Sequence, residues 1–196
     1  MDLPDRATAE ALLFEFTRSE SLRKHALAVE TAMRAYARRY AAERPGDPEV
    51  DEHAWGLIGL LHDFDYEMHP QAPDHPLKGS EILAERGYPE AFRRAILSHA
   101  DYTGVTRETL AEKTLFAVDE LCGFLTAVAL VRPSRSLAEV DARAVKKKLK
   151  DKAFARSVSR EDVIQGPEAL GIDFDAHVEF VIGALRPVER ELGLGT

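Results

Sequence analysis

The sequence predicts an all-α fold, and three observations support this prediction. Apolar residues recur at intervals of three and four in several segments, which is the period of an α-helix. Residues typical of helix caps precede these segments, and glycine or proline follows them. The alternating pattern of a half-buried β-strand does not recur over any useful length. We therefore expect a bundle of helices joined by loops.

Three helices are expected before residue 62. Thr8 is the expected cap of the first, over residues 8–16, and Ser19 or Ser21 starts the second, which runs to about residue 43. The apolar residues of this second helix recur at helical spacing and are Leu22, Val29, Met33, Tyr36 and Tyr40. Asp51 caps the third helix, which is apolar on nearly every side. A helix of that kind lies at the centre of a core.

The middle of the chain is expected to form three further helices. Residues 77–86 form a helix that Gly87 stops, and Pro89 starts the next one, which runs to about residue 99. Thr106 is the expected cap of a long helix that continues to residue 130. The dipeptide Arg132-Pro133 then ends it.

The composition changes after residue 133, where a C-terminal helical extension is expected. Residues 144–152 form a basic helix, and Ser159 starts a helix that closes near Gly171. Asp173 opens the last helix, which Pro187 kinks or breaks. These features predict three more helices in the extension.

Length and composition indicate a globular protein. The chain has 196 residues, of which 45% are apolar and 31% charged, and this is enough to bury one full core. We expect a single domain over residues 1–196, with a core at about 19–132 and an extension at about 133–196. The one cysteine excludes an intrachain disulfide and a cysteine-based zinc cluster.

Charge and hydropathy indicate where the protein is located and which partners it does not bind. The net charge of −8 argues against general nucleic-acid binding. No stretch approaches the roughly 18 apolar residues of a membrane span. The N-terminus lacks the pattern of a signal peptide. A cytoplasmic location is therefore expected, and the sequence leaves open whether the protein is a monomer or a homodimer.

Histidines and aspartates lie at the predicted helix ends and on the apolar helix faces. The pair His62-Asp63 ends the apolar third helix, where burying both groups without partners would cost several kcal/mol. A metal ion satisfies both kinds of side chain. The candidate ligands are His25, His62, Asp63, His75, His99 and Asp119. Any one of them alone is more often a satisfied core group, but the set together favours a metal site.

The ligand types also limit the metal. Imidazole nitrogen and carboxylate oxygen without thiolate suit iron, manganese, cobalt, nickel or catalytic zinc. Six ligands are too many for one ion with open positions, and they suit two divalent ions bridged by a carboxylate. Asp63, beside His62, is the candidate bridge.

The order of these residues resembles the HD-domain superfamily of metal-dependent phosphohydrolases, in its binuclear, six-ligand form. The resemblance covers roughly residues 19–132 and includes the contexts His75-Pro76-Leu77-Lys78-Gly79 and Ile96-Leu97-Ser98-His99. It implies an all-helical fold in which Asp63 binds both ions. It implies that the first ion is bound by His25, His62, Asp63 and Asp119, and the second by Asp63, His75 and His99.

Two departures argue against a cyclic-dinucleotide phosphodiesterase. Phe64-Asp65 follows the His-Asp pair, where many signalling phosphodiesterases of the superfamily have Ile-Gly. Gly87-Tyr88-Pro89 precedes His99 instead of following it. The segment from Lys146 to Asp162 is similar to an extension of some uncharacterised bacterial members, which implies no particular substrate.

The expected activity is hydrolysis of a phosphate ester or anhydride, and the expected substrate is a nucleotide. A hydroxide that bridges two ions would attack phosphorus in line with the leaving oxygen. The absence of a glycine-rich phosphate loop fits hydrolysis directed by metals. Two alternatives stay open. One is a di-iron oxygenase with the same ligand set, and the other is a non-catalytic metal-binding sensor or scaffold.

Further charged residues are candidates for supporting roles. Asp65, Glu67 and Asp101 are expected to orient a ligand histidine or to protonate the leaving group. Lys78, three residues after His75, is a candidate for binding substrate phosphate. The other candidates for phosphate binding are spaced by four, so that they would share one helix face, and are Lys148, Lys152 and Arg156. A solvated basic face is the alternative. Three histidines match no position of the motif and are expected on the surface or in loops: His53, His69 and His177.

Overall fold

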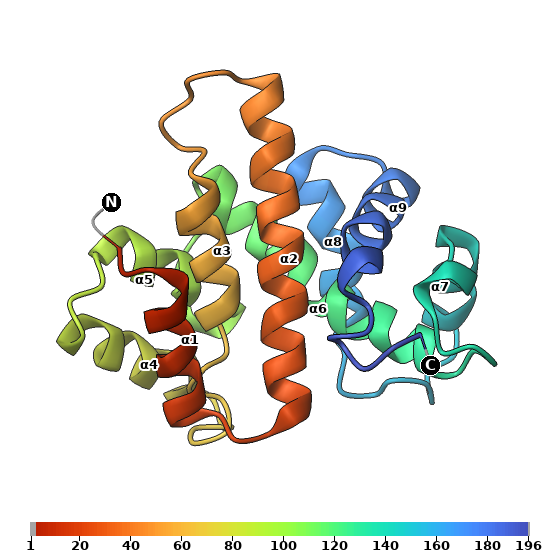
Figure 1. The fold of residues 1–196 in the computed structure, drawn as a ribbon, viewed down its shortest axis with the longest axis horizontal. Coiled ribbons are helices and arrows are strands. Elements are labelled where there is room, and N and C mark those ends of the chain that lie inside the picture. The colour runs from red at the N-terminus through yellow and green to blue at the C-terminus, as the bar shows by residue number, and fades with distance from the viewer. Residues whose placement is uncertain (1–2, 196) are drawn as a thin grey trace.

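The computed structural model describes residues 3–195, and the regular structure in that range is entirely helical (Figure 1). The predicted all-α fold is confirmed, since residues 3–195 contain no β-strand. The α-helices are α1 (Arg6–Phe16), α2 (Glu20–Glu43), α3 (Glu52–Leu61), α4 (Asp74–Glu85), α5 (Glu90–Leu97), α6 (Leu110–Leu130), α7 (Ala142–Leu149), α8 (Arg160–Leu170) and α9 (Phe174–Leu185). Short 3-10 helices are η1 (Asp101–Thr103), η2 (Leu137–Glu139) and η3 (Arg186–Val188). Within residues 3–195 no helix has the length and apolar character needed to cross a lipid bilayer.

Helix α2 runs through the middle of the molecule (Figure 1). It packs most extensively against α3, and also against α6 and α9. Helices α1, α3, α4 and α5 lie on one side of it, and α7, α8 and α9 lie on the other. Helix α8 packs along α6. The predicted division into a core and an extension stays a prediction.

Helix α3 is the centre of the core, as its composition predicts. Every residue from Ala54 to Leu61 is buried. Burial of its large side chains, among them Trp55 and Leu57, contributes on the order of 1.5–3 kcal/mol each. Gly59 lets α3 approach α2 closely, because a Cβ at Gly59 would lie 2.9 Å from the backbone of Glu30. This close packing brings the C-terminal end of α3 beside α2.

Most predicted caps are confirmed, and several helix starts differ from the prediction. Ser19, Asp51, Ser159 and Asp173 each accept a hydrogen bond from the first turn of their helix. Helix α1, however, begins at Arg6, because Asp5 and not Thr8 is its cap.

Helix α6 starts at Leu110, later than predicted, and Thr109 replaces Thr106 as the cap. The Glu112 carboxylate accepts hydrogen bonds from the backbone N–H groups of Glu108 and Thr109, and it thereby closes a capping box. Helix α4 begins at Asp74, before the predicted start, but His75 and Pro76 inside it do not have helical dihedral angles.

The basic helix predicted over residues 144–152 is shorter than expected. It ends at Leu149, so that Lys148, Lys152 and Arg156 do not share one helix face. The reason lies in Arg160, which the spacing argument did not consider. Its guanidinium group donates hydrogen bonds to backbone carbonyls in the segment that follows α7, those of Leu149, Asp151, Phe154 and Val158. These bonds satisfy carbonyl groups that a longer helix would have paired internally.

Candidate metal centre

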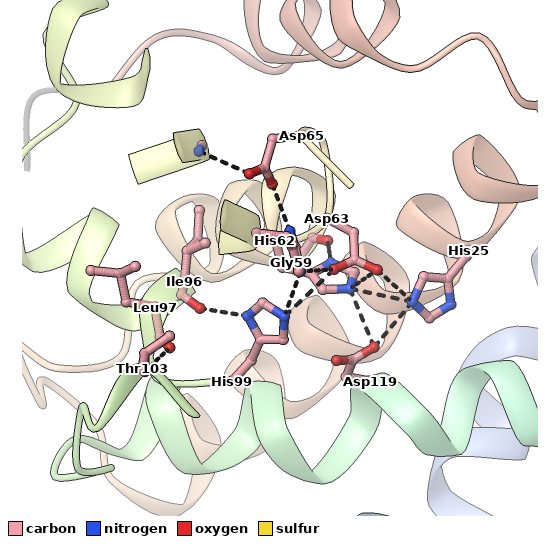
Figure 2. Close-up of polar contacts among 12 residues, drawn as sticks. His25, Gly59, His62, Asp63, Asp65, Ile96, Leu97, His99, Thr103 and Asp119 are labelled. Carbon is pink, nitrogen blue, oxygen red and sulfur yellow. Dashed lines mark hydrogen bonds and ion pairs between the residues drawn. The ribbon is translucent and has the colours of Figure 1, made fainter. Parts of the chain in front are cut away.

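Four of the predicted ligands meet where α2, α3 and α6 come together (Figure 2). His25 Nε2 on α2 lies 3.0 Å from Asp119 Oδ1 on α6 and 3.2 Å from His62 Nε2 at the end of α3. His62 Nε2 lies 3.4 Å from Asp63 Oδ2 and 3.2 Å from Asp119 Oδ1. The four side chains form a first cluster whose donor atoms converge on one point.

The other predicted ligands form a second cluster that shares Asp63 with the first. His75 Nε2 lies 3.1 Å from Asp63 Oδ1, and His99 Nε2 lies 3.5 Å from the same oxygen. The two histidine nitrogens lie 3.3 Å apart. Oδ1 of Asp63 thus faces the second cluster while Oδ2 faces the first, so that one carboxylate spans both.

The orientations of three histidine rings are set by acceptors behind them. His62 Nδ1 donates to the Gly59 carbonyl at 2.8 Å, and His99 Nδ1 donates to the Ile96 carbonyl (Figure 2). His75 Nδ1 donates to Asp65 Oδ1 at 2.8 Å. A carbonyl and a carboxylate only accept, so these bonds place the proton of each neutral ring on Nδ1. The lone pair of each Nε2 then points into the clusters.

This arrangement fits a bound cation. In the neutral rings of His75 and His99 two nitrogen lone pairs face each other at 3.3 Å with no proton between them, which is unfavourable unless a positive charge lies there. Ligands about 2.1 Å from an ion are separated by about 3.0–3.4 Å in octahedral or tetrahedral geometry. Several donor pairs of both clusters have such separations. The imidazole and carboxylate donors fit divalent metals of the first transition row.

Without a metal the two clusters bind protons tightly. Burial lowers the pKa of His75, but the carboxylates of Asp63 and Asp65 outweigh it and raise this pKa to about 9. Burial likewise lowers the pKa of His62, but the carboxylates of Asp63 and Asp119 hold it well above its usual value. Burial raises the pKa values of Asp63 and Asp119, but the neighbouring histidines outweigh it and lower both. The clusters therefore behave as concentrated sites for positive charge.

The three acids predicted for supporting roles lie in different places. Asp65 is fully buried, and its second oxygen accepts a 2.8 Å hydrogen bond from the Gly79 backbone N–H, so its contacts orient His75. Asp101 lies exposed at the rim of the cavity and pairs with Arg107. Glu67 accepts hydrogen bonds from the backbone N–H groups at the start of α2, those of Arg18 and Ser19. This contact secures the α2 entry and lies outside the cavity lining.

A cavity of about 450 Å³ opens over the two clusters. None of the four cations predicted to bind phosphate lines it. Lys78 is half-exposed and pairs with Glu81 at 2.9 Å, and Lys148 lies over the ring of Phe154. Lys152 and Arg156 are exposed. The described lining contains no lysine or arginine, so the histidines and any bound metal are the cationic groups that face a ligand there.

Sequence reasoning missed several residues of this cavity. Glu120 lines it beside Asp119, and burial together with that carboxylate raises the pKa of Glu120 to about 8. Asp162 also lines it, and burial raises its pKa as well. Tyr66 and Tyr102 are exposed at the mouth, where the Tyr102 hydroxyl donates to the His75 carbonyl at 2.7 Å. The signal that could have identified Glu120 is its position directly after Asp119, as a second acid within an apolar helix.

His177 is buried, which corrects its expected place in the surface or a loop. Its Nε2 donates to the Ala117 carbonyl at 2.9 Å, so Nδ1 accepts the Tyr36 hydroxyl proton at 2.6 Å. The residue lies away from the clusters and joins α9 to α2 and α6. Val181, four residues later on the same helix face, is the apolar neighbour that indicates this burial. His53 is exposed, as predicted, and donates to the Pro4 carbonyl.

The sequence of this chain was also compared with those of known proteins. Residues 22–123, just over half of the chain, match the family model of the HD domain. The matched range contains all six clustered side chains. Neither the search of curated proteins nor the search of solved structures found a significant match. The family match, the all-helical fold and the two His/Asp clusters agree, and the chain belongs to the HD-domain family, whose members are in general metal-dependent phosphohydrolases.

Proposed function

We propose that this protein hydrolyses a phosphate ester or anhydride at a centre for two divalent metal ions. The observation that carries the proposal is the position of Asp63, whose two oxygens face two different clusters of histidines. In the proposed centre Asp63 holds both ions. The remaining ligands of the first ion are His25, His62 and Asp119, and those of the second are His75 and His99.

Bound divalent ions lower the pKa of water to near neutrality and neutralise charge on phosphate oxygens. The side chains of the protein hold the geometry for this chemistry. Asp65 and the Gly59 and Ile96 carbonyls keep the protons of three ligand rings on Nδ1, which leaves each Nε2 free to bind. The partly buried position of the clusters limits competition by bulk water for the same positions.

A nucleotide is the substrate that we propose within this class. The exposed rings of Tyr66 and Tyr102 at the mouth of the cavity offer surfaces on which a base can stack. Because the described lining has no lysine or arginine, a single phosphate suits the cavity better than a triphosphate. Among nucleotides we therefore propose a nucleoside monophosphate.

The test combines metal analysis of the purified protein with a substrate screen. We expect about two equivalents of a divalent metal per chain, and release of phosphate from monoesters when manganese is supplied. The variant His62→Ala should lose metal and activity together. His53→Ala is the matched control, because His53 is an exposed histidine that lies outside both clusters.

Two results would contradict the proposal. One is the absence of hydrolysis with every metal tested while His62→Ala keeps a full metal content. The other is product formation that requires dioxygen and an iron pair, which would indicate the oxygenase alternative. Running the screen with and without oxygen separates these outcomes.

A further inference from the structure

A second cavity, of about 680 Å³, adjoins the cavity over the clusters beside His25. This second cavity lies between α2, α6 and residues 155–158, and it reaches Leu192 and Gly193 near the C-terminus. We call it the apolar groove. The residues that line both cavities are Leu22, His25, Gly123, Ser157 and Val158. The two cavities adjoin at these shared residues, and we call the pair the cleft, with the metal centre at one end.

Gly123 stands where the two cavities join. A Cβ built at Gly123 would lie 3.9 Å from Val158 Cγ2 and 4.0 Å from His25 Nδ1, and it would meet no other group within 4 Å. Gly123 therefore packs close to Val158 and His25 at this boundary, and its helical backbone accepts a side chain. A larger side chain at this position would extend toward Val158 and His25, two of the residues that line both cavities.

The two ends of the cleft differ in chemistry. One face of α6 lines the groove with Gly123, Thr126, Ala127 and Leu130, at helical spacing. Val158 and Leu192 complete its apolar wall, and the charges of Lys24 and Glu20 neutralise each other in an ion pair at its edge. The cavity over the clusters carries instead the carboxylates of Asp63, Asp119, Glu120 and Asp162. A ligand that fills the whole cleft has a metal-binding head and an apolar tail.

We propose that the apolar groove binds an apolar substrate group, so that the centre also takes phosphate monoesters of alkyl or arylalkyl alcohols, a substrate class beside the nucleoside monophosphates. This inference rests on the proposed function, because it places the phosphate at the two clusters. From Gly123 to Leu130 the face of α6 extends about 10 Å, which accommodates a chain of about eight carbons. The single phosphate follows from a lining without lysine or arginine. Gly123, at the boundary of the two cavities, is the position where an added side chain should shorten the permitted substrate.

Calorimetric titration of the metal-loaded protein with alkylphosphonates tests the proposal without relying on turnover. We use the ethyl, butyl, hexyl and octyl compounds, whose phosphonate head is not hydrolysed. Each methylene that enters the groove should tighten the dissociation constant about two- to fourfold. In the Gly123→Leu variant, the dissociation constants of ethylphosphonate and hexylphosphonate should be nearly equal.

Two further variants make the test specific. Ala127→Phe, one helical turn farther along α6, should abolish the gain from hexyl to octyl while the gain from ethyl to butyl remains. Gly183→Leu is the matched control. It adds the same side chain at an exposed helical glycine of α9 that has no neighbour within 4 Å, and it should keep the wild-type ratios.

The outcomes separate this inference from the proposed function. Equal affinity for all four phosphonates in the wild type, or equal effects of Gly123→Leu and Gly183→Leu, overturns the inference even where phosphate monoesters are hydrolysed. A chain-length dependence that Gly123→Leu removes supports it, even where no ester is hydrolysed and the proposed function fails. Absence of binding by every phosphonate overturns the inference, while the metal analysis and the monoester screen decide the proposed function separately.

Discussion

Asp65 accepts a 2.8 Å hydrogen bond from Nδ1 of His75, the nitrogen that faces away from the second cluster. Its other oxygen accepts from the Gly79 backbone N–H, so both oxygens of this fully buried carboxylate are occupied by donors. The contact fixes which nitrogen of His75 faces Asp63. It links the loop after α3 to the start of α4, and it sets the geometry of the second cluster.

Replacing Asp65 should weaken the second metal site selectively. The carboxylate offers one oxygen to each of two donors, whereas the amide of the Asp65→Asn variant has a single acceptor oxygen. The variant therefore leaves either His75 or Gly79 without a partner. We expect the affinity for the metal of the second cluster to fall about 10- to 100-fold, while the affinity for the metal of the first cluster stays unchanged. Metal titration followed by elemental analysis measures this, and Asp74→Asn, an exposed acid of the same region, is the control.

An independent substitution should have the same effect. A Cβ at Gly79 would lie 2.6 Å from Asp65 Cγ, so Gly79→Ala must displace the carboxylate from His75. If both variants keep two metals of unchanged affinity, Asp65 does not position His75 for metal binding.

The shared position of Asp63 predicts a distinctive pattern of metal loss. Asp63→Ala should lose both ions, because its two oxygens face the two clusters separately. Asp119→Ala should lose the first ion only, and His99→Ala the second only. Metal stoichiometry by elemental analysis distinguishes the three results, with circular dichroism as the check on folding. Loss of a single ion by Asp63→Ala would show that this carboxylate does not bridge.

The burial of His177 predicts a loss of stability in weak acid. Burial lowers its pKa to about 4, because the charged ring is poorly solvated there, although the hydrogen bond to the Ala117 carbonyl opposes the shift. The unfolded chain binds a proton near pH 6.5, so between about pH 6.5 and about pH 4 the unfolded state holds more protons. The free energy of unfolding should therefore decrease as the pH falls through that window, and this residue should add no pH dependence above it.

Urea unfolding at about pH 7.5 and at about pH 5.5 measures the effect. From these pKa values His177 should account for a loss of about 1 kcal/mol between the two conditions. His177→Gln should be less stable at the higher pH but should lack this part of the pH dependence. An identical difference between the two pH values in both proteins would mean that His177 titrates normally in the folded state.

Lys148, at the end of α7, and Lys152, which follows the helix, should contribute little to substrate binding. The sequence suggested that Lys148 and Lys152 bind phosphate, in which case charge reversal raises KM. In the structure neither lines the cavity, and Arg160 binds the backbone of the segment that contains Lys152. We expect Lys148→Glu and Lys152→Glu to leave KM within about twofold. A large rise in KM would show that this segment closes over the substrate.

Local sequence patterns predicted much of the fold and the identity of the clustered residues. The caps Ser19, Asp51, Ser159 and Asp173 accept hydrogen bonds from N–H groups three residues away, so they can be predicted from neighbouring positions. The apolar surroundings of His62-Asp63 likewise indicated burial. The misplaced starts of α1 and α6 reflect competition between nearby caps, which Asp5 and Thr109 win through better-placed partners.

By itself the sequence determined the all-α class, the centrality of α3 and the six side chains that suit metal ions. Only the tertiary structure decided which oxygen of Asp63 faces which cluster, and that Asp65 orients His75 while Glu67 secures the start of α2. It also decided that Arg160 binds the backbone carbonyls after the basic helix and that Gly123 lies at the boundary of the two cavities. The physical reason is the separation along the chain over which each kind of interaction acts. Periodicity and capping are interactions within a few residues, whereas these contacts join segments through packing that depends on every helix together.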